Sequence, residues 1–202
     1  TKRAFDRAIA DYDKAIALKP DFAAAFDFRG FAYRELGDLD RAIADYDKAI
    51  IYKPDFALAF NDRCTAYVDK RDADRAIADC DRAVALKPDL AGAFNSRCVA
   101  YFIRRDFDRA VTDCDKAIAL RPDLPNPFRH RGRALAGKGE FERAIADFDK
   151  AIALKPDYAE ARTDRAAAIE ARDKAQASVM AAAAGVAAPP PPAASSPAPA
   201  PT

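Results

Sequence analysis

Four cysteines and one histidine are the side chains of this 202-residue chain best suited to metal binding or nucleophilic chemistry. The cysteines are Cys64, Cys80, Cys98 and Cys114, with separations of 16, 18 and 16 residues. Zinc sites use short paired spacings instead, so we predict no metal site. We expect buried reduced thiols, because a free cysteine packs as a small hydrophobic residue. In the alternative, a disulfide would join Cys64 to Cys80 or Cys98 to Cys114.

The single histidine, His130, lacks the sequence context of a catalytic base. The chain has no glycine-rich phosphate loop and no Ser-His-Asp or Cys-His spacing. Its carboxylates are numerous, but acid–base work also needs an apolar cleft and a perturbed neighbour. We therefore predict that the chain is not an enzyme and needs no cofactor.

Prolines that recur every 34 residues define the elements that must position these side chains. They are Pro20, Pro54, Pro88, Pro122 and Pro156, and each closes a phrase such as DYDKAIALKP. A fixed period of this length indicates stacked copies of one supersecondary unit. Framework residues in such an array stack one copy on the next, so function is expected where the copies differ.

Each copy contains two helical patterns. After each of the first four prolines, phenylalanine recurs at six residues, a small residue at ten, and tyrosine or leucine at thirteen, as at Phe60, Cys64 and Tyr67. Alanines such as Ala76 mark the close approach of a second helix. A short turn with an acidic residue precedes that second helix, and a basic residue and the next proline end it.

This order of aromatic, small and turn residues at fixed spacing resembles the tetratricopeptide repeat family over roughly Phe5 to Ile169. The resemblance implies an all-α, right-handed superhelical solenoid of antiparallel helix pairs. It also implies a concave groove, lined by the first helix of each pair, that binds a protein or an extended peptide.

The repeat register predicts four segments. They are a half-repeat with only the second helix at 1–20, four full helix pairs at 21–156, a capping helix at 157–180 and a disordered Ala/Pro-rich tail at 181–202. The half-repeat should leave an apolar strip of Phe5, Ile9 and Tyr12 exposed. Exposed strips seek partners, so we expect either another chain, including a second molecule of this protein by self-association, or an upstream repeat to cover this N-terminal helix.

Composition limits the partners. The chain has 33 basic and 32 acidic residues and a formal net charge of +1, so no global field favours nucleic acid or an anionic membrane. It has no run of about 18 apolar residues that could insert into a membrane. The default localisation is cytoplasmic, and the expected partners are proteins.

Charged residues also follow the repeat. An arginine stands nine residues after each proline, at Arg29, Arg63, Arg97, Arg131 and Arg165. An aspartate stands twenty-five residues after each proline, at Asp45, Asp79, Asp113 and Asp147, with Asp11 in the half-repeat. We expect an Arg–Asp ladder between neighbouring helices, because a partly buried arginine needs a carboxylate. The alternative is an electropositive stripe that binds anions.

The positions that vary between copies predict the groove surface. We predict a peptide-binding groove made of Asp27, Phe28, Phe31, Asn61, Asp62, Thr65, Asn95, Val99, Phe102, Arg129, His130 and Arg133. Its first copies are acidic, its middle is apolar and its last copy is basic, while Asn61 and Asn95 could hold a peptide backbone. The carboxylate clamp of some family members is absent from the first three copies. The alternatives are solvated groove side chains, or a structural subunit held by its edges or convex face.

Overall fold

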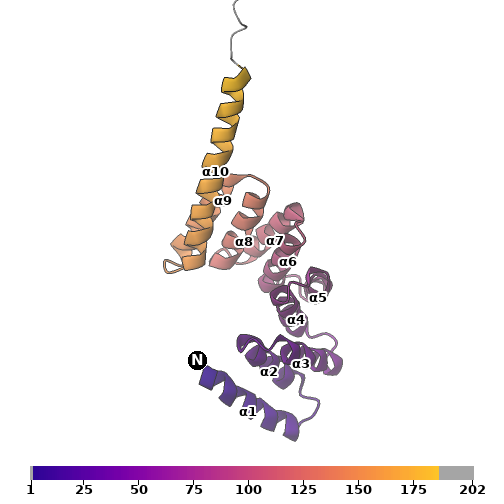
Figure 1. The fold of residues 1–202 in the computed structure, drawn as a ribbon. Coiled ribbons are helices and arrows are strands. Elements are labelled where there is room, and N and C mark those ends of the chain that lie inside the picture. The colour runs from indigo at the N-terminus through magenta and orange to yellow at the C-terminus, as the bar shows by residue number, and fades with distance from the viewer. Residues whose placement is uncertain (1, 187–202) are drawn as a thin grey trace, which may run out of the picture.

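The computed structural model describes residues 2–186, which form ten α-helices and no strand (Figure 1). The helices are α1 (Lys2–Leu18), α2 (Ala23–Glu35), α3 (Leu39–Tyr52), α4 (Ala57–Asp69), α5 (Ala73–Leu86), α6 (Ala91–Ile103), α7 (Phe107–Leu120), α8 (Pro125–Gly137), α9 (Phe141–Leu154) and α10 (Ala159–Val186). The helix α10 continues past residue 180, where the cap was expected to end. The remainder of the predicted tail, 187–202, lies outside the described residues.

Short turns fold α3, α5, α7 and α9 back along the helices that precede them. Each turn contains one residue with positive φ, at Gly37 (81°), Arg71 (59°), Arg105 (63°) and Gly139 (82°). In the first three turns the next aspartate accepts a hydrogen bond from the backbone N–H three residues later, as Asp72 does from Arg75. This cap satisfies an N–H that the helix itself leaves unpaired.

The repeated proline ends the second helix of each pair. The residue before it is pushed out of helical geometry, as at Lys87 with φ −141° and ψ 88°. Steric contact between a proline ring and the preceding residue causes this change. The 34-residue spacing of the prolines therefore sets the length of each helix pair.

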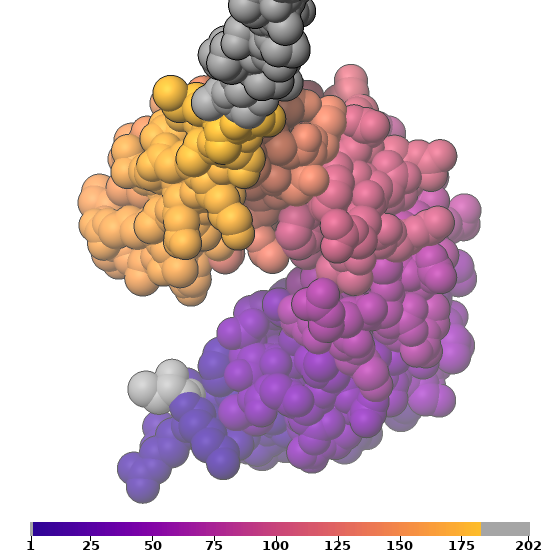
Figure 2. Space-filling model, turned by 45° about the horizontal axis from the view of Figure 1, so that its top comes forward, coloured from indigo at the N-terminus to yellow at the C-terminus, as the bar shows by residue number. Residues whose placement is uncertain are grey.

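The first helices of the pairs form an inner layer. Successive first helices contact one another from α2 through α4, α6 and α8 to α10, whereas each second helix contacts only the first helices on either side of it. The array therefore curves with its first helices inside. Figure 2 shows the hollow between the N-terminal and C-terminal halves. This arrangement confirms the all-α solenoid expected from the sequence.

Close contacts between paired helices require one small residue. A Cβ added to Gly30 would lie 2.9 Å from the ring of Tyr46, and one added to Gly132 would lie 2.7 Å from Phe148. Both rings are almost completely buried. Glycine at these two positions lets an aromatic ring fill the space between two helices.

Cysteine pairs occupy the same two positions in the middle copies. Cys64 is bonded to Cys80, and Cys98 to Cys114, with Cα–Cα distances of 5.6 and 5.5 Å. The prediction of reduced thiols is therefore wrong. The helix separation that a Gly–aromatic pair fills in the outer copies also suits a disulfide, so both cysteines of a pair face each other.

The predicted Arg–Asp ladder is confirmed. Arg97 donates hydrogen bonds from Nε and Nη2 to both carboxylate oxygens of Asp113, each at 2.7 Å. It also donates from Nη1 to Asp81 in the preceding copy, at 2.6 Å. Arg29, Arg63 and Arg131 repeat this arrangement. The second aspartate, which joins one copy to the next, was not predicted.

Candidate functional site

All twelve residues of the predicted groove lie on first helices, three on each of α2, α4, α6 and α8. Because these helices touch in succession, neighbouring triplets form one continuous surface. We call this surface the inner face. Its side chains are half-buried or exposed, except that Asp27 is buried.

At the C-terminal end of the inner face, side chains from α6 and α8 come together. The guanidinium of Arg133 lies 4.5 Å from the ring centroid of Phe102, close enough for a cation–π contact. Val99 and His130 line the same small depression. A cavity of about 230 Å³ continues from Phe102 and Arg133 toward α10.

Only part of the predicted basic cluster is available to an anion. Burial lowers the pKa of His130 to about 3, with smaller contributions from Arg129 and Arg133. His130 is therefore neutral at pH 7, and its Nδ1 lies 2.8 Å from Asn95 Oδ1. Since that oxygen can only accept, Nδ1 carries the proton and donates.

The two neighbouring arginines differ in their partners. Arg129 donates from Nε to Asp164 at 2.6 Å, whereas Arg133 forms no ion pair with any residue of the described chain. The sequence predicted a basic cluster of Arg129, His130 and Arg133 at this end. Of these three, only Arg133 is a cation without an ion-pair partner among the described residues.

Polar side chains in the middle of the inner face bond to one another. Asn61 donates from Nδ2 to Asp62 at 2.9 Å and accepts from Ser96 Oγ at 3.4 Å. Ser96 Oγ also lies 3.1 Å from Thr65 Oγ1. Asn61 therefore uses both ends of its amide within the protein. Asn95 uses only its oxygen among the described contacts, which leaves its amide nitrogen for a ligand.

The N-terminal end contains an acidic pair, the buried Asp27 and the half-buried Asp62. Asp27 is only 3% exposed, and its Oδ1 has no hydrogen-bond partner among the described residues. Burial, and then the charge of Asp62, raises the pKa of Asp27 to about 7. Burial also raises the pKa of Asp62. The hydroxyl of Tyr46, beneath this pair, likewise has no partner in the described structure.

Tyr46 was not among the predicted groove residues. Its position holds Tyr12, Phe148 or a disulfide cysteine in other copies, so it was assigned to the framework. The signal that could have identified it is the hydroxyl, which a fully buried framework position does not need.

Two exposed aromatic rings lie next to the acidic pair. Phe28 and Phe31 are 52% and 42% exposed. Tyr12 of α1 stacks on Phe28 with ring centroids 5.9 Å apart, and Phe5 meets Phe31 edge-on at 6.4 Å. The N-terminal strip expected to be exposed is thus half-buried against α2, although α1 has no fully buried residue.

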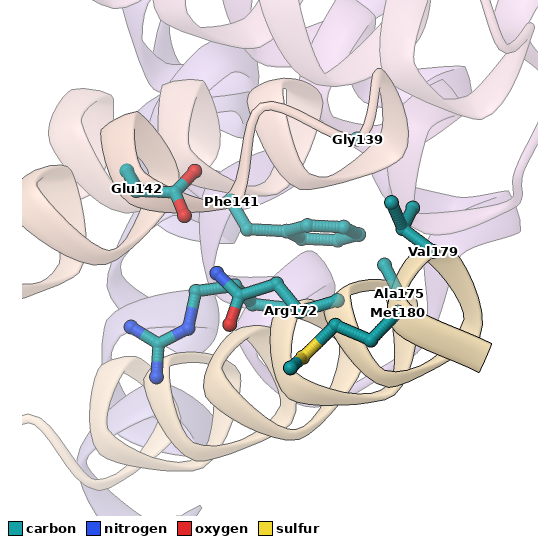
Figure 3. A pocket seen from close by; sticks show the side chains of 8 residues that line it. Gly139, Phe141, Glu142, Arg172, Ala175, Val179 and Met180 are labelled. Carbon is teal, nitrogen blue, oxygen red and sulfur yellow. The ribbon is translucent and has the colours of Figure 1, made fainter. Parts of the chain in front are cut away.

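A second pocket lies outside the inner face, between the start of α9 and the end of α10. It has a volume of about 440 Å³, and the ring of Phe141 faces Ala175, Val179 and Met180 across it (Figure 3). Its lining contains Glu142 and Arg172 but no cluster of metal-ligating side chains. Within residues 2–186, no helix is both long and apolar enough to cross a membrane.

Comparison with family models shows the family to which the chain belongs. Models described as "Tetratricopeptide repeat" match residues 61–125 and 99–173, and a model described as "TPR repeat" matches residues 30–70. Together they cover 30–173 without interruption. No curated protein sequence matches the chain significantly.

Solved structures share the fold. The chain is similar to MamA, with 26% identity and a TM-score of 0.65 over 79% of this chain and 94% of that one. It is similar to TTC0263, a thermophilic TPR protein of Thermus thermophilus, with 19% identity and a TM-score of 0.71 over 82% and 90%. The second TPR domain of human RPAP3, solved in complex with the HSP70 peptide SGPTIEEVD, matches with 27% identity and a TM-score of 0.53 over 55% and 93%.

Proposed function

Because the chain belongs to the tetratricopeptide repeat family, we propose that it is a non-catalytic adaptor that binds an extended segment of a partner protein on its inner face. One observation carries this proposal. The framework positions repeat from copy to copy, whereas the inner face changes from acidic and aromatic on α2 to apolar and basic on α6 and α8. The RPAP3 domain with its bound peptide supports peptide binding by a related fold.

The charges of the inner face fix the orientation of the bound segment. A basic residue of the segment lies near Asp27 and Asp62, an apolar side chain lies against Val99 and Phe102, and a carboxylate lies near Arg133. Complementary charges set orientation and association rate more than affinity. The apolar middle is therefore the main anchor, since desolvated aromatic contacts dominate binding energy.

Binding measurements with single variants test this function. The partner is first isolated by affinity capture, and its affinity is then measured by calorimetry at low and high salt. Phe102→Ala weakens binding by about 2 kcal/mol, and Arg133→Ala by up to about 1 kcal/mol. Only Arg133→Ala reduces the salt dependence.

Matched controls lie on the outer helices. Leu120→Ala and Arg82→Ala remove an exposed apolar and an exposed basic side chain from α7 and α5. They leave binding unchanged if the segment occupies the inner face. If the controls weaken binding and the inner-face variants do not, the chain is instead a structural subunit held by its convex face or edges.

We also propose that α1 mediates self-association. In each full copy, the ladder arginine pairs with the aspartate 16 residues later. Arg165 of α10 reaches only Asp149, and Asp11 of α1, at the matching repeat position, contacts only Lys14 within the described chain. Asp11 of one molecule can therefore complete the ladder at Arg165 of a second molecule.

Sedimentation of charge-reversal variants tests this association. Asp11→Arg and Arg165→Asp each shift the chain toward monomer, and mixing the two variants restores the association. If the unmodified chain remains monomeric at high concentration, the self-association is excluded while peptide binding by the inner face is unaffected.

A further inference from the structure

Two buried oxygen atoms at the N-terminal end of the inner face lack partners. Asp27 Oδ1 and the Tyr46 hydroxyl form no hydrogen bond to any described residue, although Asp27 is 3% exposed and Tyr46 is completely buried. Buried polar groups are nearly always hydrogen-bonded, so each exception calls for a physical reason. A ligand that brings N–H donors would supply one.

The charges around these atoms favour a cation. Asp27 on α2 faces Asp62 on α4, and each raises the local negative potential. Tyr46 on α3 adds no positive charge. Arg34, whose charge acts on Asp62, donates to Asp69 at 2.7 Å and to Glu35 at 3.3 Å, so it is shared with two other carboxylates. Neither Asp27 nor Asp62 forms an ion pair with a described residue.

Aromatic rings border the same place. Phe28 and Phe31 are exposed on α2, and Tyr12 stacks on Phe28. Aromatic faces attract cations and also pack against aliphatic side-chain stems. The second, third and fourth copies replace this pair of rings with Asp62 and Thr65, Ser96 and Val99, and His130 and Arg133. Only the first copy combines the acidic pair with exposed aromatic rings.

We propose that Asp62, Phe28 and Phe31 at the surface, with Asp27 and Tyr46 behind them, form a site that binds the side-chain ammonium of a lysine in the partner segment. This inference rests on the proposed peptide binding and names the residue that its acidic end recognises. A lysine ammonium presents three donors around one point, which suits oxygen atoms contributed by α2, α3 and α4. The planar fork of arginine suits both oxygens of one carboxylate, as in the Arg–Asp ladder of this chain.

The inference is tested with short peptides that differ at one residue. The probes are acetyl-AAXAA-amide peptides in which X is lysine, arginine or norleucine, and binding is followed by NMR shifts of residues on α2, α3 and α4. We expect the lysine peptide to bind at least about tenfold more tightly than the norleucine peptide, and more tightly than the arginine peptide. The preference is larger at pH 8 than at pH 5.5, because Asp27 with a pKa of about 7 is ionised only at the higher pH.

The chain itself offers a conservative variant. Asp27→Asn introduces the residue found at the same repeat position in the next two copies, Asn61 and Asn95, so the variant should fold. It abolishes the lysine preference. Asp89→Asn removes the same charge from an exposed turn and retains the preference.

Four outcomes overturn the inference. They are equal binding of the lysine and norleucine peptides, stronger binding of the arginine peptide, a lysine preference that persists in Asp27→Asn, and the absence of any peptide binding. The proposed adaptor function is judged separately, because Phe102→Ala affects partner affinity whether or not this site selects lysine.

Discussion

Arg63 on α4 donates hydrogen bonds to both carboxylate oxygens of Asp79 on α5, with Nε–Oδ2 and Nη2–Oδ1 distances of 2.7 and 2.6 Å. Asp79 is buried, and these two bonds are its side-chain contacts to a cation. Arg63 also donates to Asp47 on α3, at 2.5 Å. Asp79 therefore has one cationic partner, Arg63, whereas Arg63 has two carboxylate partners.

Removal of the arginine costs more than removal of this aspartate. Arg63→Met leaves Asp79 buried without a cation and lowers the free energy of unfolding by about 3 kcal/mol. Asp79→Leu costs less, because Arg63 keeps Asp47. The Arg63→Met/Asp79→Leu double variant is more stable than Arg63→Met alone, since replacing a whole buried pair by apolar groups is often neutral. Urea unfolding measures all three, and equal losses for the two single variants would refute the unequal dependence.

The disulfide of the second copy should be replaceable by the packing of the first copy. Cys80→Tyr alone places a ring against the side chain of Cys64, and the clash costs about 3 kcal/mol or prevents folding. Cys64→Gly/Cys80→Tyr recreates the Gly30–Tyr46 pair and recovers most of that loss. Thermal melts under reducing conditions compare the variants. A double variant no more stable than Cys80→Tyr would show that the two copies are not interchangeable.

Two of the four inter-helix turns contain an arginine with positive φ, at the position where the other two turns contain a glycine. Arg71 has φ 59°, and Gly37 has φ 81° in the corresponding turn. A left-handed backbone costs an ordinary residue about 1 kcal/mol relative to glycine. Arg71→Gly should therefore stabilise the chain by about 0.5–1 kcal/mol, and Gly37→Ala should destabilise it by about 1 kcal/mol. Chemical unfolding at one fixed pH gives both values, and the same sign for both changes would contradict this account.

His130 makes the stability of the C-terminal half depend on pH. Its folded-state pKa of about 3 lies below the ordinary value of 6.5. His130 therefore binds a proton more readily in the unfolded chain than in the folded one. As a result, the free energy of unfolding is highest above pH 6.5 and decreases as the pH falls from 6.5 toward 3. Within this window the loss is about 1.4 kcal/mol per pH unit. Relative to His130→Gln, which does not titrate, the wild type should lose stability between pH 6 and 4; parallel pH profiles would contradict this.

The sequence predicted the framework more completely than the site. The five prolines and the residues counted from them identified the helix pairs, and the regular spacing of Arg63 and Asp79 identified the ladder. These features follow from a repeated backbone geometry, so one register describes every copy. Asp47, the second partner of Arg63, was missed because it comes from the preceding copy and resembles an ordinary surface acid.

Side-chain environments explain what the sequence could not provide. His130 looked basic, yet its burial between two arginines makes it neutral. Cys64 and Cys80 looked like separate framework residues, and only the distance between the helices joins them. The unpartnered oxygens of Asp27 and Tyr46 depend on the packing of three helices. The helix α10 extends to Val186 because its alanines favour helix without needing a partner helix.

Site-specific photo-crosslinking shows whether the partner lies on the inner face. Benzoylphenylalanine replaces one aromatic residue at a time, at Phe31 or Phe102 on the inner face and at the exposed Tyr52 on the outer helix α3. We expect the Phe31 and Phe102 positions to crosslink to the captured partner and the Tyr52 position not to. Crosslinks from Tyr52 alone would show that the partner lies on the outer helices instead.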